Sequence, residues 1–600
     1  MTLTAQDPQA ANETHIQDLL AQMTLAEKIG QMTLVEKNSI AAPDITQLFI
    51  GGLLSGGGGY PTPNTAKAWR DMVRDYQDRA LATRLGIPMI YGVDAVHGHN
   101  NVYGPTIFPH NIALGATRNA DLVRQIGRAT ALEMVATGVY WNYAPALSIP
   151  NDIRWGRTYE GYGQDPALVT ELALAYFEGL QGVDGDYDLS RPDTVLATPK
   201  HYVGDGGTSW GTSRMVMLGR EYDIDQGVTE LDEDALRATH LAPYLPLLPA
   251  GALSVMAFFS SWGGYKMHAN RYLLTDVLKG EFGFQGFVVS DWQAIDQVAE
   301  DYYDAVVACI NAGVDMNMVP FDYKQFIATL TKAVEQGDVT EARIDDAVAR
   351  ILRAKLALNL FERPFPEDDS TAKVGAAEHR ALARQAVSES LVLLKNEGGL
   401  LPLDATAEGI LVGGAAAVSV GLQSGGWTIE WQGKDGDITP GTHFLDALQA
   451  AVSPQTLVAY NRFGRFDELV EGQSAAGPAE IGIVVIAEQP YAEGMGDRAD
   501  LTLGDEDREL IARVAAQSER TLLILFSGRP LIITEELEMV DACVAACLPG
   551  TEGQGITDVL FGDKPFTGKL SFNWPRSMAQ IPNGQGGEPL FAIGFGLTTN

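Results

Sequence analysis

Short apolar segments alternate with amphipathic helical segments from the N-terminus to about residue 360, and this alternation constrains the fold more than any other feature. The apolar segments are rich in β-branched and aromatic residues, which is typical of buried strands. Seven of them are clear, over residues 48–54, 88–94, 139–145, 194–200, 252–259, 287–291 and 313–319. Helical patterns lie between them, for example over residues 71–85, 120–137 and 166–180. The alternation predicts a (β/α)8-type barrel in which one strand escapes recognition.

A second alternating pattern follows residues 362–378, a charged stretch with prolines that is typical of a linker. A long helix is expected from about His379 to Lys395, and apolar strands are expected over residues 409–414, 456–460, 481–488, 521–528 and 541–549. Strands that are apolar on both faces indicate a parallel sheet covered by helices. We therefore expect an α/β protein with a barrel over residues 1–361, an α/β sandwich over residues 379–562, and a C-terminal segment, 563–600, that packs on the second domain.

The chain is strongly acidic, with 42 Lys and Arg residues against 77 Asp and Glu residues and a formal net charge of −35. Binding to nucleic acid depends on a basic surface, so no nucleic-acid partner is expected. No uninterrupted apolar stretch approaches the roughly 18 residues of a membrane span, so no membrane interaction is expected either. The N-terminus lacks the basic and apolar regions of a signal peptide, which favours a cytoplasmic protein or a periplasmic or secreted protein whose signal has been trimmed. We expect a monomer or a homodimer.

The three cysteines, Cys309, Cys543 and Cys547, are too few for a disulfide framework and are expected to be buried thiols. No cysteine and histidine residues share the spacing of a metal site, so neither a metal nor another cofactor is expected. The glycines after residue 408 do not form the G-x-G-x-x-G pattern of a phosphate-binding loop. A nucleotide-binding enzyme is therefore not favoured.

Polar residues stand where several of the expected barrel strands end. Asp291 follows the run 287–290, Asp94 follows the run 88–93, and Lys200 and His201 follow the run 194–199. A single residue of this kind is most often a solvated rim residue. In a parallel barrel, however, the carboxyl ends of all the strands meet on the face that carries the active site. Their convergence therefore predicts a catalytic pocket.

The kinds of residue at this face indicate a sugar. Arg157, Lys200 and His201 would lower the pKa of Asp291 and keep it ionised, which suits a nucleophile. Asp94 can accept hydrogen bonds from two vicinal hydroxyl groups. Trp292, directly after Asp291, offers an aromatic face of the kind that packs on the apolar side of a sugar ring.

Glycoside hydrolysis requires a second carboxyl group, and the second domain contains several candidates. They are Glu430, Glu488, Glu493 and Asp497. Glu493 lies in a Gly-flanked loop, and such a loop can carry a side chain into the pocket of a neighbouring domain. Glu488 is nearer the expected strand and is the better candidate for a structural role. These residues alone leave the choice open.

The motifs of the chain together resemble glycoside hydrolase family 3, over nearly the whole length and in the order of the family. They are YGVDAVHGHNNVYGPTIFPHNIALGATRN, RWGRTYEGYGQDP, ATPKHYVGDGGT, GFVVSDW, GGWTIEWQG, EQPYAEGMGD and LPGTEGQGITDVLFGD. The likeness is greatest to exo-acting β-glucan glucohydrolases of the plant type. The sequence KHYVGDGGTSWG lacks the second histidine of the subgroup that cleaves N-acetylglucosaminides, so that activity is not favoured.

The resemblance implies a role for each candidate residue, in an active site between the two domains. It implies that Asp291 is the nucleophile and Glu493 the acid/base. It implies that the terminal glucosyl hydroxyls are bound by Asp94, Arg157, Lys200 and His201, and that the next sugar is clamped by Trp292 and Trp431. Arg154 is expected to be structural. Phe259 stands where plant-type members carry a tyrosine, so no polar role is assigned to it.

The expected function is therefore that of a retaining, exo-acting β-glucosidase, which releases glucose from the non-reducing ends of β-glucosides and β-glucan oligosaccharides. An aromatic clamp reads few hydroxyl groups, so tolerance between β-1,3 and β-1,4 linkages is expected. Three alternatives stay open: a β-xylosidase of the same fold, a transglycosylase of the same fold, and a non-catalytic sugar-binding protein.

Overall fold

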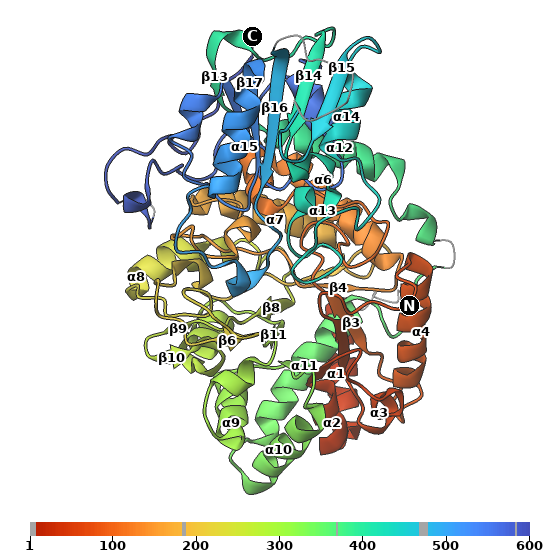
Figure 1. The fold of residues 1–600 in the computed structure, drawn as a ribbon. Helices are drawn as coiled ribbons and strands as arrows, with labels where there is room; N and C mark the ends of the chain where they lie inside the picture. The colour runs from red at the N-terminus through yellow and green to blue at the C-terminus, as the bar shows by residue number, and fades with distance from the viewer. Residues whose placement is uncertain (1–7, 183–187, 368–369, 467–477, 583–584, 600) are drawn as a thin grey trace, which may run out of the picture.

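The computed structural model describes residues 8–182, 188–367, 370–466, 478–582 and 585–599. The expected linker, 362–378, includes residues 368–369, and the expected absence of a signal peptide concerns residues 1–7 as well; both of these short stretches lie outside the described ranges. Figure 1 shows the first domain, red to light green, below the second domain, which runs from green to blue. None of the helices in the described ranges combines the length and apolar character needed to cross a lipid bilayer.

The first domain is an α/β barrel, as expected. Within the described residues its parallel strands are β1 (Thr33–Glu36), β2 (Gly52–Ser55), β3 (Ile90–Val93), β4 (Trp141–Asn142), β5 (Leu196–Ala197), β8 (Ser254–Met256), β11 (Phe287–Val289) and β12 (Asn317–Met318). Six pair in the order β12-β1-β2-β3-β4-β5, and β11 pairs with β8. Single parallel bridges, Tyr202 with Ala257 and Val289 with Met316, join these two groups into a ring. The strand that the sequence pattern missed is β1.

Helices pack around the strands of the barrel. They include α4 (Ala66–Leu81), α6 (Ala120–Val135), α7 (Pro166–Gln181), α9 (Tyr302–Ala312), α10 (Tyr323–Gln336) and α11 (Glu341–Ala357). Side-chain caps begin several of them; the Asp165 side chain accepts from the Ala167 N–H, with Pro166 next in the chain. α6 and α7 approach so closely at Gly179 that a Cβ atom there would lie 2.1 Å from the carbonyl oxygen of Arg124. This glycine is therefore needed for the helix packing.

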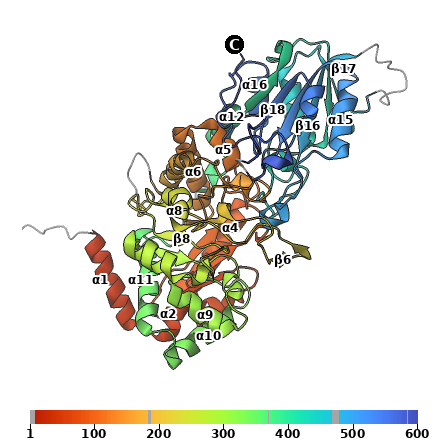
Figure 2. The same ribbon diagram turned by 90° about the vertical axis from the view of Figure 1, so that its left-hand side faces the viewer.

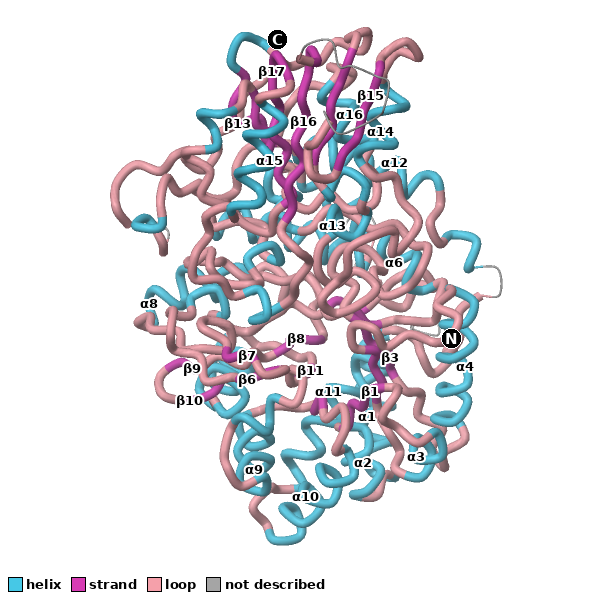
Figure 3. The backbone as a smooth tube through the Cα atoms, viewed as in Figure 1, coloured by secondary structure: helices cyan, strands magenta, loops and turns pink. Residues whose placement is uncertain are grey.

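Long loops at the carboxyl ends of the barrel strands face the second domain (Figure 3). The segment between β5 and β8 contains a hairpin of β6 (Val216–Met217) and β7 (Arg220–Glu221), followed by α8 (Glu233–Leu236). The segment between β8 and β11 contains a second hairpin, β9 (Ser261–Trp262) and β10 (Tyr265–Lys266). These insertions build the wall of the pocket described below.

The second domain is a six-stranded sheet in the order β13-β18-β17-β16-β14-β15, with only β13 antiparallel to its neighbour within the described residues. The strands are β13 (Val392–Asn396), β14 (Gly409–Gly413), β15 (Leu457–Asn461), β16 (Ala479–Ala487), β17 (Ser518–Phe526) and β18 (Ala542–Ala545). Helices α12 (Ala377–Ser390), α14 (Phe444–Ala451), α15 (Asp505–Ala515) and α16 (Gln554–Leu560) cover it (Figures 1 and 2).

The expected helix from His379 to Lys395 is wrong in its second part. α12 ends at Ser390, and Val392–Asn396 is strand β13, which pairs with β18. The run 391–394 is apolar throughout, and such a run is compatible with either a buried helix or a buried strand. The free edge of β18 decides in favour of the strand, because pairing satisfies backbone groups that are buried there.

Candidate active site

One pocket, of about 340 Å³, brings together all eight residues that the sequence predicted for the site. They are Asp94, Arg157, Lys200, His201, Asp291, Trp292, Trp431 and Glu493. The barrel residues follow the carboxyl ends of their strands, and the second domain contributes Trp431 and Glu493 from above. The volume lies at the low end of the ~300–1,000 Å³ typical of small-molecule sites, which suits one sugar ring and the group next to it.

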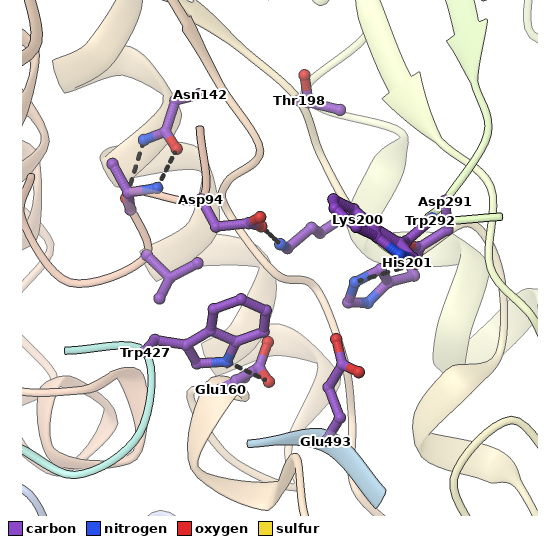
Figure 4. A network of polar contacts seen from close by, with 12 residues as sticks. Asp94, Asn142, Glu160, Thr198, Lys200, His201, Asp291, Trp292, Trp427 and Glu493 are labelled. Carbon is purple, nitrogen blue, oxygen red and sulfur yellow. Dashed lines mark hydrogen bonds and ion pairs between the residues drawn. The ribbon is translucent and has the colours of Figure 1, made fainter. Parts of the chain in front are cut away.

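Asp94 and Lys200 form an ion pair at one end of the pocket (Figure 4). The Lys200 ammonium donates to Asp94 Oδ1 at 2.6 Å, and their side chains are 2% exposed for Lys200 and 17% for Asp94. The Asp94 carbonyl accepts from the side-chain amides of Asn100 (2.9 Å) and Asn101 (3.0 Å), which fixes the loop after β3. Asp94 thus keeps carboxylate acceptor capacity for a ligand at a well-defined position.

Arg157 is buried and links the groups of the pocket. Its guanidinium donates twice to Glu160, at 2.9 Å for each bond, and lies 3.0 Å from His201 Nε2. It also lies 3.6 Å from Glu493 Oε1. Burial raises the pKa of Glu160, but Arg157, Lys200 and the Trp427 indole together outweigh it, so the pKa of Glu160 is lowered overall. Arg157 is therefore a fixed positive charge between the two domains.

His201 is a neutral imidazole in this setting. Burial lowers its pKa well below the usual value, and the nearby charges of Arg157 and Lys200 lower it further. Its Nδ1 lies 2.9 Å from Asp205, and since Arg157 donates to Nε2, we assign the proton to Nδ1. His201 Nε2 lies 4.0 Å from Asp291 Oδ2.

Asp291 presents one free carboxylate oxygen to the pocket. Its Oδ1 accepts from the Trp292 N–H at 2.7 Å, whereas its buried Oδ2 has no hydrogen-bond partner among the described residues. The cations Arg157 and Lys200 do lower the pKa of Asp291, as expected, but the expected net lowering is wrong, because burial has the larger effect and raises the pKa to about 6. The carboxyl group is still mostly ionised at neutral pH.

Glu493 begins a short 3-10 turn, Glu493–Gly496, in the loop after β16. Its backbone has φ of 55°, an unfavourable left-handed conformation for a residue other than glycine. The two flanking peptides hold it there: the Gln432 amide bonds both the N–H and the carbonyl of Ala492, at 3.0 and 3.2 Å, and Asp225 accepts from the Gly494 N–H at 3.0 Å. Burial raises the pKa of Glu493 to about 8, and the charges of Asp225, Asp291 and Glu160 raise it as well, against the effect of Arg157.

The other carboxyl groups considered in the second domain lie outside the pocket. Glu488 pairs with Arg529 at 3.2 Å, and Glu430 accepts from the Tyr60 hydroxyl at 2.7 Å. Asp497 Oδ2 accepts from three consecutive N–H groups of the barrel loop, those of residues 223, 224 and 225, at 3.0–3.1 Å. Asp497 therefore ties the loop of Glu493 to the barrel, and Glu493 is the one candidate that faces the ligand space.

Trp292 and Trp431 enter the pocket beside the glycine-rich loop after β2. A Cβ atom at Gly56 would lie 3.1 Å from the Trp292 ring, and one at Gly57 would lie 2.5 Å from Trp431 Cα. The glycines therefore allow both tryptophans to lie close to the loop after β2. Arg154, expected to be structural, pairs with Asp152 and packs on the ring of Trp210.

Family models match nearly the whole chain in two parts. The model described as the Glycosyl hydrolase family 3 N terminal domain matches residues 24–354, and that of the C-terminal domain matches residues 391–599. The chain belongs to glycosyl hydrolase family 3.

Named relatives of this family 3 chain are similar over most of their length. Lysosomal beta glucosidase of Dictyostelium discoideum is 32% identical over 646 residues, covering 98% of this chain and 76% of that protein. The crystal structure of an exo-1,3/1,4-beta-glucanase from a Pseudoalteromonas species has a TM-score of 0.90 and 39% identity, with 100% of this chain and 75% of that chain covered. Beta-glucosidase from Listeria innocua in complex with glucose has a TM-score of 0.83 and 27% identity, over 98% and 83% of the two chains.

The sequence alone missed several residues of the family 3 site. Glu160 and Trp427 were within the motifs already noted, and the Trp427 indole donates to Glu160 at 3.1 Å. Asp205, which accepts from His201, also stands in a motif already noted, whereas Asp225 accepts from the Gly494 N–H of the Glu493 loop through a contact that no local pattern indicates. Met215 and Met217 line the pocket from the β6–β7 hairpin, and nothing in their sequence neighbourhood indicates it. In the described part of the chain, no three His, Cys, Asp or Glu residues are placed to hold a metal ion.

Proposed function

We propose that this family 3 hydrolase is a retaining, exo-acting β-glucosidase that releases glucose from the non-reducing ends of β-glucosides and β-glucan oligosaccharides. One observation carries the assignment of roles. The pocket holds Asp291, whose buried Oδ2 has no hydrogen-bond partner among the described residues, and Glu493, whose pKa of about 8 keeps it protonated at neutral pH. Glycosidase chemistry needs such a pair, one ionised and one protonated.

In the first step, Asp291 Oδ2 attacks the anomeric carbon while Glu493 donates its proton to the departing glycosidic oxygen. The bond from the anomeric carbon to that oxygen breaks, and a glycosyl ester on Asp291 forms. An Arg157 guanidinium nitrogen lies 3.6 Å from Glu493 Oε1, so its positive charge stabilises the negative charge that proton donation leaves on Glu493.

In the second step, Glu493 acts as a base. It takes a proton from a water molecule, whose oxygen attacks the anomeric carbon from the face that the leaving group vacated. The ester bond to Asp291 breaks, glucose leaves as the β-anomer, and Asp291 is ionised again. The Trp292 N–H, 2.7 Å from Asp291 Oδ1, stabilises the carboxylate as it departs.

The other polar groups bind the terminal glucosyl unit. Asp94 can accept from two neighbouring hydroxyl groups, while Lys200 and Arg157 donate to hydroxyl oxygens. Gripping the hydroxyls farthest from the cleaved bond closes that end of the pocket, which favours exo action. Trp292 and Trp431 hold the next sugar by its faces. A β-glucosidase of Listeria innocua has been solved with glucose, and a mutant form of it with laminaribiose, which is consistent with such a substrate class for this chain.

The decisive test of the mechanism is the identity of the trapped residue. A 2-deoxy-2-fluoro β-glucoside should label Asp291, and NMR should show the β-anomer of glucose as the first product. A label elsewhere, or an α-product, would overturn the mechanism.

Asp291→Asn separates an enzyme from a sugar-binding protein, since the variant should lose turnover and still bind glucose. A higher rate on aryl glucoside than on aryl xyloside would exclude a β-xylosidase, and the reverse would indicate one. Formation of oligosaccharide products at high sugar concentration would indicate a transglycosylase.

A further inference from the structure

We propose that Met215 and Met217 form an aglycone-binding wall that favours β-glucosides whose leaving group is a neutral apolar chain or ring. The inference rests on the proposed function, because it concerns the group that departs from the glucosyl unit. The other residues of the pocket act on the glucosyl unit or the next sugar, whereas the two methionines would select the class of leaving group.

The β6–β7 hairpin directs alternate residues to opposite sides. Met215 and Met217 line the pocket, whereas Val216, between them, is 61% exposed and Leu218, at the tip, is 79% exposed. This alternation is the ordinary side-chain period of a strand. Figure 2 shows the hairpin, at the label β6, projecting from the barrel below the second domain. The hairpin thus offers a matched pair of apolar faces, one toward the pocket and one toward solvent.

Contacts with the Glu493 loop place this wall on the leaving-group side. Tyr222 donates its hydroxyl to Met217 Sδ at 3.4 Å, and its ring packs so tightly on Gly494 that a Cβ there would lie 2.2 Å away. Arg220 donates to the carbonyl of Met495 at 2.5 Å. Because Glu493 protonates the departing oxygen in the proposed mechanism, a wall beside its loop contacts the departing group.

The polar side chains on this side of the pocket are engaged with one another. Gln297 donates to Gln226 at 2.9 Å, accepts from Lys266 at 3.1 Å, and lies 3.8 Å from Met215 Sδ. A leaving group rich in hydroxyls would have to compete with these bonds, whereas an apolar one would not. Asp296 also lines the pocket and would repel an anionic leaving group.

Methionine suits this role because its unbranched, polarizable side chain adapts to apolar ligands of different shape. Trp292 continues the apolar surface, since Phe321 packs edge-on against it at 5.5 Å and is 48% exposed. A leaving group that extends from the glucosyl unit would therefore pass the two methionines and the Trp292 ring before it reaches solvent.

A series of alkyl 1-thio-β-glucosides, from methyl to heptyl, tests the proposal with ligands whose thioglycosidic bond resists hydrolysis. Their inhibition constants against an aryl β-glucoside should fall by roughly two- to fourfold for each added methylene that reaches the wall. The double variant M215S/M217S should flatten this dependence on chain length, and M215L/M217L should keep it. The double variant V216S/L218S, on the outer face of the same hairpin, is the matched control and should keep the full dependence.

Two results would overturn the proposal. One is an inhibition constant that does not change with alkyl chain length in the unaltered protein. The other is a folded M215S/M217S variant whose inhibition constants change with chain length as much as those of the unaltered protein. Comparison of methyl with heptyl within each variant removes any general loss of affinity. If no β-glucoside releases glucose, the proposed function fails, and calorimetric dissociation constants of the same thioglucosides still decide whether the wall exists.

Discussion

The pKa values of Asp291 and Glu493 predict a bell-shaped pH dependence of kcat/KM, and Glu493→Gln should remove one side of it. The free enzyme is active when Asp291 is ionised and Glu493 is protonated, and their pKa values are about 6 and about 8. About 80% of the molecules have this form at pH 7, and only about 10% have it at pH 5 or pH 9. The rate constant should therefore fall roughly ninefold on either side.

The variant Glu493→Gln separates the acid limb of the pH profile, assigned to Asp291, from the alkaline limb, assigned to Glu493. A substrate such as 2,4-dinitrophenyl β-glucoside, whose leaving group needs no protonation, should still react with the variant, and its kcat/KM should stay constant from about pH 7 to about pH 9. The acid limb should remain near pH 6, because Glu493 is already neutral at that pH and its replacement by an amide changes no charge there. An alkaline limb that persists in Glu493→Gln would refute the assignment of Glu493, and an acid limb near pH 4 would refute the dominance of burial at Asp291.

Three further changes test other parts of the site. Asp225→Asn keeps an acceptor for the Gly494 N–H but removes a charge that raises the pKa of Glu493, so the alkaline limb of kcat/KM should move to lower pH; an unmoved limb would contradict this. Trp431→Ala should raise KM for laminaribiose and cellobiose by about 10- to 100-fold, the value of one buried aromatic contact, and affect methyl glucoside less; equal effects on all three would argue against the clamp. Gly57→Ala should lower stability by about 1–3 kcal/mol, because its Cβ would lie 2.5 Å from Trp431 Cα, whereas Gly409→Ala, with 3.7 Å to the nearest atom, should not; thermal unfolding measures both, and equal melting temperatures would count against the clash.

The strands of the structure show which patterns a sequence can reveal. Each of the seven strands expected in the first domain coincides with one barrel strand, because a short apolar run between helices has few other uses. β1 was missed since its four residues, Thr33–Glu36, begin and end in polar side chains. The sequence pattern predicts a helix for β13 because its apolar run has no period of its own, and only its neighbour β18 distinguishes the two structures.

Some residues of the site could likewise be predicted from local sequence, whereas others depend on contacts between distant segments. Asp94, Lys200, His201 and Asp291 were recognisable because the end of a strand is a local property and the geometry of a parallel barrel brings such ends together. Glu493 was one of four carboxyl groups on residues alone, and the family motifs favoured it. Its place in the pocket depends on contacts with Asp225, 268 residues earlier (493 − 225).

By itself the sequence determined the two alternating α/β patterns, the polar strand ends and the family, because each of these is written in neighbouring residues. Only the tertiary structure decided the direction of the pKa shift at Asp291, the capture of the Glu493 loop by Asp225 and Asp497, and the turn of Met215 and Met217 toward the pocket. Burial sets the first, contacts between distant segments set the second, and the hairpin's orientation over the barrel sets the third. None of these three features can be read from a short stretch of chain.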